Sequence, residues 1–350
     1  MPAYFSFSLR PVQAFIHQAR RTRDFWAGSQ LLAWLCATAV VATRAQDPKA
    51  QFEYPLYDDD FIISLGLGAA PSYPVSNRFS ALVRDDFDGA AVRQAVHRAW
   101  EALTERVWHL AIGSPSHWPL ARAVWDRQIN GFLRIGWVVG DRVDLLDALH
   151  AAEMDGYGIE EPGLNCSLMP GWQEVSGVPH RIGVARLTEE RREFWRHVHD
   201  RTGYALEGEG DEYLCAMALV KRLLNRCLPG IKVPLNAGVT MLGWPALAQV
   251  PSLYAIAAGP WIARVLRDAE DGPLKRFVED WSRASAGYSA VDLFGPSVAQ
   301  GWRDRGCTAA RLDCAALYGR DDDVGGDLAA DTNQLPGSMH ALECGKPSRY

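Results

Sequence analysis

The sequence of 350 residues predicts a mixed α+β fold with two or three domains. Over residues 1–140 the strand and helix patterns follow the order β-α-β-β-α-β. From residue 141 the composition turns to helices and glycine-rich joints. The first order is that of a ferredoxin-like, or split βαβ, domain. We therefore expect a ferredoxin-like domain at 1–140, a mainly helical domain at 141–318, and an acidic, Gly- and Pro-containing linker or tail at 319–350.

Strand patterns recur through the first part of the chain. Residues 4–9 alternate apolar with small side chains, as a strand does. Further strands are expected at 51–56, 77–83 and 132–139. A short apolar run at 61–63 follows an acidic turn at 58–60.

The stretch after the first strand predicts one long helix with two different faces. Pro11 suits a first helical turn. The apolar face carries Val12, Phe15, Ile16, Ala19, Trp26, Leu32, Leu35 and Cys36. The other face carries Gln13, His17, Arg20, Arg21 and Arg23. Its guanidinium groups suit phosphate binding, and a solvated basic face is the alternative interpretation.

Periodicity predicts the remaining helices at 88–111, 114–129, 144–154, 188–202, 254–268 and 273–285. Residues 160–177 have the composition of a loop. The strongest amphipathic pattern of the second part lies at 211–227, with a buried face of Leu214, Met217, Val220, Leu223 and Leu224.

The composition is that of an ordinary globular protein, with 48% hydrophobic and 22% charged residues. The formal net charge of -6 provides no global attraction to nucleic acid, so RNA would have to bind a local basic surface. No stretch reaches the roughly 20 uninterrupted apolar residues of a membrane span. The seven cysteines are odd in number and scattered, which favours reduced thiols. We expect a cytoplasmic protein without a membrane partner.

The run PVQAFIHQARRTRDFWAGSQLLAWL at 11–35 closely resembles the opening of the first palm domain in the large subunit of type III-B CRISPR effector complexes, the Cmr complexes. The resemblance continues at Asn77-Arg78-Phe79, at the Trp-Gln segment 125–129, at Gly243-Trp244-Pro245, and at the final six residues. The family's palm has the ferredoxin-like order expected above. The family's HD nuclease precedes this palm, and its metal-binding GGDD palm follows a segment similar to 345–350. We expect both to be missing here.

The resemblance implies an architectural role in a crRNA-guided antiviral ribonucleoprotein. Expected partners are the backbone, small and crRNA 5′-end-binding subunits, the crRNA and the target RNA. Contact with RNA would be directed mainly at its phosphates. The residues expected to contact RNA or phosphate are Arg20, Arg21, Arg23, Asn77, Arg78, Lys221 and Arg222.

The resemblance also implies a four-cysteine zinc site built from two Cys-x-x-Cys pairs. Cys166 and Cys215 retain the first cysteine of each pair, whereas Met169 and Ala218 replace the second. A structural zinc site needs four nitrogen or sulfur ligands. We therefore expect a degenerate zinc-finger region with two reduced, buried cysteines and no zinc.

Other acidic or histidine motifs do not predict a catalytic centre. His199-Asp200 forms an HD dipeptide, but no further ligand set accompanies it, so we expect the polar end of a surface helix. The acidic run 321–327 superficially resembles a GGDD turn, yet it lacks flanking apolar strands and suits a linker. No catalytic residue and no cofactor are expected.

Two other hypotheses remain open at this point. The chain could supply one half of a split palm-type nucleotide cyclase, with ATP and Mg²⁺ held together with a metal-binding palm on another chain. Asn77, Arg78 and the basic helix would then face nucleotide phosphates. It could also be a truncated relic without partners. The sequence leaves the enzyme question open, and the chain alone is expected to lack a complete catalytic site.

Overall fold

The computed structural model describes residues 3–69, 75–140, 161, 163–203, 212–246, 253–284 and 304–305. The chain divides into two units, one with Met1–Arg20 and Asp24–Ala248, the other with Arg21–Arg23 and Gln249–Tyr350. The helix expected at 144–154 and the tail at 319–350 lie outside the described residues.

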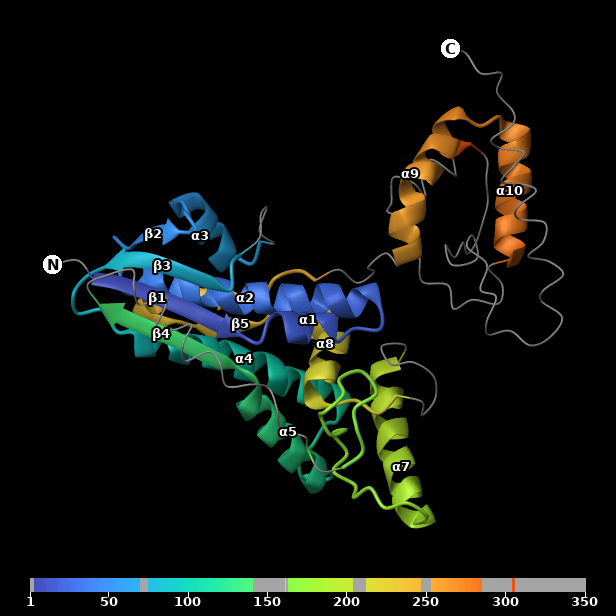
Figure 1. Ribbon diagram of the computed structural model, residues 1–350, viewed down its shortest axis with the longest axis horizontal. Helices are drawn as coiled ribbons and strands as arrows, with labels where there is room; N and C mark the ends of the chain where they lie inside the picture. The colour runs from blue at the N-terminus through green and yellow to red at the C-terminus, as the bar shows by residue number, and fades with distance from the viewer. Residues whose placement is uncertain are drawn as a thin grey trace. The chain divides into compact units, whose positions relative to one another are not determined.

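A four-stranded antiparallel sheet organises the first unit (Figure 1). Its strands, β1 (Ala3–Arg10), β2 (Gln51–Tyr54), β3 (Arg78–Val83) and β4 (Arg134–Gly140), lie in the order β2-β3-β1-β4. Each strand overlaps a segment that the sequence predicted. The fold is therefore mixed α+β, as expected.

One face of the sheet forms an aromatic core. Phe5 and Phe7 of β1 are fully buried and contact Phe79 of β3, whose ring stacks on that of Phe7 at a centroid distance of 5.2 Å. The helices α2 (Thr22–Gln46) and α4 (Gly89–Ala111) run along the sheet (Figure 1). Since side chains alternate along a strand, Phe5 and Phe7 both point to this core, whereas Tyr4 lies on the opposite face with Ser6 and Ser8.

The long helix predicted from Pro11 is interrupted. The structure has a short α1 (Gln13–His17), a corner, and then α2. A regular helix would have the backbone N–H of Ala19 donate to the carbonyl of Phe15, but here it donates to that of His17. The ammonium of Lys221 donates instead to the carbonyls of Phe15 and Gln18. A side chain distant in sequence thus replaces local helical hydrogen bonds and stabilises the corner.

The corner also changes which residues are exposed. Trp26 was assigned to the buried face, yet 50% of it is exposed, because the predicted face does not continue across the interruption. From Leu31 to Thr43, α2 is buried on nearly all sides. By length and composition it could cross a membrane, but 67% of its most apolar window is buried inside the protein. We therefore identify α2 as a core helix.

Two further helices belong to this part of the first unit, α3 (Asp59–Gly66) between β2 and β3, and α5 (Pro119–Phe132) between α4 and β4. The apolar run at 61–63 belongs to α3, which begins where the Asp58 carboxylate accepts a hydrogen bond from the N–H of Phe61. Asp88 caps α4 in the same way. The helix expected at 114–129 begins later, at Pro119, which suits a first helical turn.

The rest of the first unit is helical with an irregular connection, as expected for 160–177. It contains α7 (Ala185–Thr202), α8 (Ala216–Cys227), and a small antiparallel pair, β5 (Lys232–Pro234) and β6 (Thr240–Leu242), joined by η3 (Asn236–Gly238). The predicted amphipathic helix at 211–227 starts only at Ala216. It is buried on all sides over most of its length rather than on one face, because α4 and α5 both pack against it.

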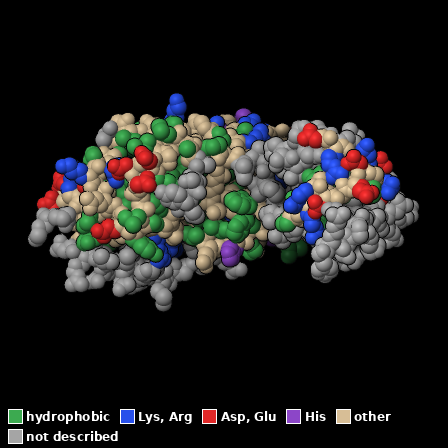
Figure 2. All heavy atoms as spheres, turned by 90° about the horizontal axis from the view of Figure 1, so that it is seen from above, with side chains coloured by type: hydrophobic (Ala, Val, Ile, Leu, Met, Phe, Trp, Pro, Cys, Tyr) green, Lys and Arg blue, Asp and Glu red, His purple; other side chains and the backbone are tan. Residues whose placement is uncertain are grey.

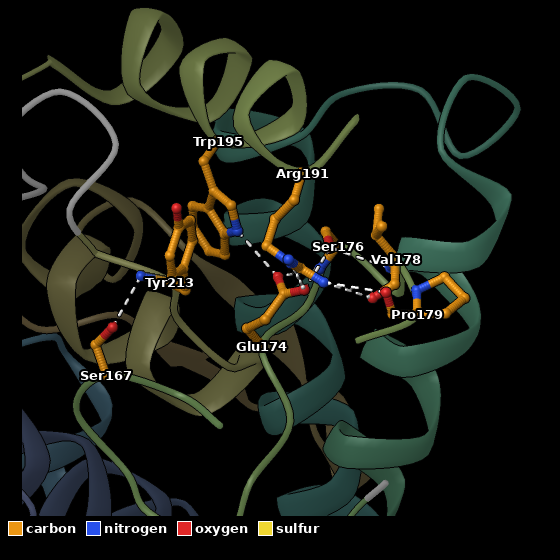
Figure 3. Close-up of polar contacts among 8 residues, drawn as sticks. All are labelled: Ser167, Glu174, Ser176, Val178, Pro179, Arg191, Trp195 and Tyr213. Atoms are coloured by element: carbon orange, nitrogen blue, oxygen red, sulfur yellow. Dashed lines mark hydrogen bonds and ion pairs between the residues drawn. The ribbon is translucent and has the colours of Figure 1, made fainter. Parts of the chain in front are cut away.

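Buried carboxylates hold the irregular connection in place (Figure 3). Glu174 is fully buried and accepts hydrogen bonds from the Trp195 indole at 2.9 Å and the Arg191 guanidinium at 3.2 Å, both on α7. Gln128 of α5 donates to Glu161 and accepts from the N–H of Ala216 at the start of α8. The Trp-Gln segment noted in the sequence therefore joins α5, the connection and α8.

The second unit contains α9 (Leu253–Asp268) and α10 (Asp271–Ala284), which confirm the helices expected at 254–268 and 273–285. Their buried side chains include Ile262, Val265, Leu274, Phe277 and Trp281. Arg305 donates to the Asp271 carboxylate at 2.7 Å and to the carbonyl of Leu266.

Candidate nucleic-acid interface

Three arginines gather on one face of the sheet, at one end. Arg10 at the end of β1 lies directly opposite Arg134 of β4, and Arg78 of β3 lies opposite Ser8, two residues before Arg10. Because side chains alternate along a strand and opposed residues share a face, all three guanidinium groups project from the face opposite the aromatic core. The register of the strands thus creates a cluster of positive charge.

These charges influence one another. Burial lowers the pKa of the Arg10 guanidinium, and the positive charges of Arg78 and Arg134 lower it further. Arg10 still carries its charge at neutral pH, since an arginine pKa lies far above it. An anion placed on this face would reduce the repulsion among the three cations, so the cluster favours phosphate or another anion.

A groove of about 410 Å³, which we call the sheet-end groove, opens beside this cluster. It is lined by Arg10, Val12, Gln13, Tyr54, Ser76, Asn77 and Arg78. Among these described residues there is no carboxylate, whereas arginine, amide and hydroxyl groups supply many hydrogen-bond donors. A donor-rich groove with positive charge suits a phosphate ester.

The residues before β3 are fixed to the end of β1. Asn77 accepts a hydrogen bond from the N–H of Leu9 at 2.9 Å through its carbonyl and donates its side-chain amide to the Leu9 carbonyl. The Ser76 hydroxyl accepts from the N–H of Arg78, and the N–H of Ser76 donates to the Tyr57 hydroxyl. These bonds set the positions of Arg10 and Arg78 before any ligand binds.

A second cavity, of about 500 Å³, lies beside β2 and β3. Its lining includes Asp47, Lys49, Arg84 and Asp85, so charges of both signs face it. The Asp47 carboxylate already accepts hydrogen bonds from the backbone N–H groups of Lys49 and Arg84. Its acidic lining suits an anionic ligand less well than the sheet-end groove does.

The three arginines predicted on the basic face, Arg20, Arg21 and Arg23, belong to two different units of the chain, and their contact with RNA stays a prediction. Arg20 belongs to the first unit and is exposed, with its N–H donating to the Asp24 carboxylate. Arg21 and Arg23 are grouped with the second unit. A few residues after Arg20, Phe25 and Trp26 are 45% and 50% exposed. The helical periodicity did not predict this exposed aromatic pair.

Lys221 and Arg222 lie in the interior, in contrast to a role at an RNA surface. The Arg222 guanidinium is fully buried between the carboxylates of Asp24, at 3.2 Å, and Glu212, at 2.7 Å. The Lys221 ammonium lies 4.1 Å from the centroid of the Phe15 ring in addition to its carbonyl contacts. Both cations thus hold α8 to the corner between α1 and α2, and we do not include them in the surface proposed below.

Burial also makes Lys221 sensitive to pH. Removal from water lowers its pKa to about 8, although the nearby Asp24 charge favours the protonated form. In the unfolded chain the pKa is near 10.4, so between pH 8 and 10 the unfolded state binds more protons than the folded state. Lys221 should therefore add stability as the pH rises through this interval, by at most about 1.4 kcal/mol per pH unit.

Comparison with a Lys221→Met variant isolates this contribution from other titrating groups. We expect the free energy of unfolding of the unmodified chain, relative to that of Lys221→Met, to increase between pH 8 and 10 in urea titrations. A relative stability that stays constant or declines over this interval would contradict the lowered pKa.

The two remnant cysteines lie together in the interior. The Cys166 sulfur accepts hydrogen bonds from the N–H groups of Leu168, Met169 and Cys215, the last at 3.1 Å. Burial raises the pKa of the Cys166 thiol, but these bonds and one from the Cys215 side chain outweigh it and lower the pKa. Burial raises that of Cys215 well above its ordinary value.

This donor set does not fit a tetrahedral zinc ion. The Cys215 thiol lies 3.7 Å from the Met169 thioether, and position 218 is an alanine. Zinc sites of proteins use thiolate, imidazole or carboxylate ligands, four in a structural site. Across the described part of the chain, no group of three or more His, Cys, Asp or Glu side chains could hold a metal ion.

Asn77 and Arg78, both candidates from the sequence, line the groove together with Gln13 of the predicted polar helix face, whereas Arg10, Arg134 and Tyr54 were not singled out from the sequence. An arginine at the end of a strand pattern gives a weak signal by itself. Only the pairing of β4 and β3 with β1 brings these residues to one end of one face. On the surface seen in Figure 2, the described Lys and Arg side chains lie in separate small groups among acidic and apolar ones.

Comparison with known proteins adds family information to this geometry. Residues 4–105 match the family model described as CRISPR-associated protein Cmr2, N-terminal. No curated protein matches the chain. A chain in the apo state of type III-B Cmr-beta is similar, with a TM-score of 0.55 at 13% identity, over 99% of this chain and 43% of that one. A chain of type III-B Cmr-beta bound to cognate target RNA has a TM-score of 0.49 at 13% identity, over 99% and 44%.

At this identity, the likeness to the apo-state chain is one of fold. The present chain spans less than half the length of either solved chain. Arg10, Tyr54, Asn77 and Arg78 all lie within the segment that matches the Cmr2 N-terminal model. The sheet-end groove is therefore part of the Cmr2-like region.

Proposed function

We propose that this chain, whose residues 4–105 match the N-terminal Cmr2 model, is a structural, RNA-contacting component of a type III-B CRISPR ribonucleoprotein. In this role it is similar to the front part of the large subunit and acts in crRNA-guided antiviral defence as a soluble, cytoplasmic assembly. Its partners would be the backbone, small and crRNA 5′-end-binding subunits together with crRNA and target RNA.

The finer description of the fold belongs to the same proposal. The antiparallel order β2-β3-β1-β4, with helices between β1 and β2 and between β3 and β4, supports a ferredoxin-like palm. We place its boundary at residue 140, followed by a helical domain to 318 with a degenerate zinc-finger region around Cys166 and Cys215, and then a linker or tail.

The observation that carries the proposal is the position of Arg10 and Arg78, two of the three clustered arginines, within the segment that matches the Cmr2 N-terminal model. Arg10 and Arg78 lie on one face beside a groove with no carboxylate among its described lining residues. Arginine binds phosphate through paired N–H donors, and phosphate contacts position RNA without specifying its sequence. A scaffold that holds guide and target RNAs of many sequences needs this kind of contact.

Removing both arginines should weaken RNA binding. We expect the Arg10→Ala/Arg78→Ala variant of the full chain to bind single-stranded RNA at least about tenfold more weakly, because two phosphates then have no arginine partner. The slope of log K against log salt should also become shallower, by roughly 0.7 for each phosphate of the single strand that the variant no longer neutralises. Fluorescence anisotropy of labelled RNA across salt concentrations measures both quantities.

Arg192→Ala is the matched control. Arg192 is exposed on α7, and its ion pair with Glu189 is long, at 3.8 Å. We expect its substitution to leave the affinity and the salt slope nearly unchanged. If RNA binding were weakened equally in the control and in the double variant, the groove would not be part of the RNA-binding surface.

Association with a complex is tested in cells. Tagged chain should co-purify with repeat-derived guide RNA and with backbone subunits of a type III effector, as identified by sequencing and mass spectrometry. Purification of the chain without RNA or other subunits would contradict the proposed function. Recovery of a GGDD-bearing chain that completes a cyclase would favour a split enzyme instead.

A further inference from the structure

We propose that the sheet-end groove binds one unpaired nucleotide of RNA, with its phosphate on Arg10 and Arg78 and its base against the ring of Tyr54. This inference rests on the proposed RNA contact and goes further, because it names the unit of RNA that is bound. The groove would then distinguish single strands from duplexes as well as attracting negative charge.

Tyr54 is placed to act as a stacking platform. It is the last residue of β2, an edge strand of the sheet, and 67% of it is exposed although its ring is large and mostly apolar. It lines the same groove as Arg10 and Arg78. An aromatic ring next to arginines is the combination that binds single strands, because every base offers a flat face and every nucleotide a phosphate.

The remaining groove residues suit the edge of a base. Gln13, at the start of α1, is exposed, and the Asn77 amide is held by its bond to the Leu9 carbonyl. Amide groups of this kind donate and accept hydrogen bonds and so tolerate different bases. Neither side chain adds a charge that would repel a nucleotide.

The size of the groove and the geometry of stacking both favour an unpaired nucleotide. About 410 Å³ lies near the lower end of the range for small-ligand sites, roughly 300 to 1,000 Å³, which suits one nucleotide rather than a longer segment. Inside a duplex, both faces of a base are covered by its neighbours. A base can reach Tyr54 only when its strand is unpaired or its stack is opened.

The test uses the full chain and a short single-stranded RNA that carries the fluorescent base 2-aminopurine, which stacking quenches. We expect binding to quench the probe, and Tyr54→Ala to abolish the quenching and to weaken affinity about 5- to 160-fold, the effect of losing one stacked base. Tyr54→Phe should retain both, because the ring is preserved. A duplex of the same sequence should bind equally well to the unmodified chain and to Tyr54→Ala.

Trp26→Ala is the control, because Trp26 is another half-exposed aromatic residue of the first unit that does not line the groove. Circular dichroism confirms that each variant folds. If Tyr54→Ala retains quenching and affinity while Arg10→Ala/Arg78→Ala weakens binding, the stacking proposal is wrong and the RNA contact stands. If the unmodified chain binds no RNA, both proposals fail.

Discussion

Gly243→Ala should strongly destabilise the first unit. A Cβ atom at this position would lie 1.8 Å from the carbonyl oxygen of Leu228, which belongs to the backbone and cannot rotate away. The N–H of Gly243 also donates to the Ile231 carbonyl at 2.8 Å, so the backbone is held close on this side. We expect a loss of about 3 kcal/mol or more in the free energy of unfolding, at the upper end for overpacking. Urea denaturation followed by tryptophan fluorescence measures it.

Gly131→Ala is the matched control. Gly131 lies within α5, and a Cβ atom there would meet nothing within 4 Å. Alanine favours a helix over glycine by roughly 1 kcal/mol, so this variant should be as stable as the unmodified chain or more stable. Similar denaturation midpoints for the two variants would show that the close approach at Gly243 is not constrained.

Arg222→Met should produce the second large loss of stability. The substitution leaves the buried carboxylates of Asp24 and Glu212 without the guanidinium that lies between them. Breaking a buried ion pair by removing one partner typically costs about 3 to 5 kcal/mol, because a charge remains in the interior without compensation. Thermal and urea denaturation of the variant measure the change in the free energy of unfolding.

Two companion variants separate the charge from the packing. Replacing all three residues, as Asp24→Leu/Glu212→Met/Arg222→Met, should recover much of the stability, since neither buried carboxylate is then left without the Arg222 guanidinium. Arg192→Met removes an exposed arginine and should change stability by less than about 0.5 kcal/mol. An Arg222→Met variant as stable as Arg192→Met would contradict a buried ion-pair cluster.

Local pattern predicted the sheet well. The four predicted strands overlap β1, β2, β3 and β4, because alternation and apolar content mark strands that pack on a core. The main error lies at the corner between α1 and α2. The apolar periodicity continues through this corner in the sequence. The interruption depends on the Lys221 ammonium, which donates hydrogen bonds to the Phe15 and Gln18 carbonyls. The pattern of residues 11–36 does not indicate a contact with a lysine that lies about two hundred residues later in the chain.

The candidate site was predicted only in part. Asn77 and Arg78 were identified from a resemblance and do line the groove, whereas Arg10, Tyr54 and Arg134 emerged from strand pairing. Lys221 and Arg222 look in sequence like a basic pair on an amphipathic helix. Their burial follows from the two helices packed on α8 and from the carboxylate of Asp24, which the sequence alone does not place beside them.

The sequence by itself determined the α+β class, the strand order along the chain, and the likeness of the first segment to the Cmr2 family. These depend on residues close together in the chain, and periodicity and motifs can be recognised from such local patterns. Tertiary structure alone decided which arginines share a face, which cations lie in the interior, and where a groove opens. Each of these depends on register and packing between segments far apart in sequence. Electrostatic and steric interactions depend on how far apart two groups lie in space, and not on how far apart they lie along the chain.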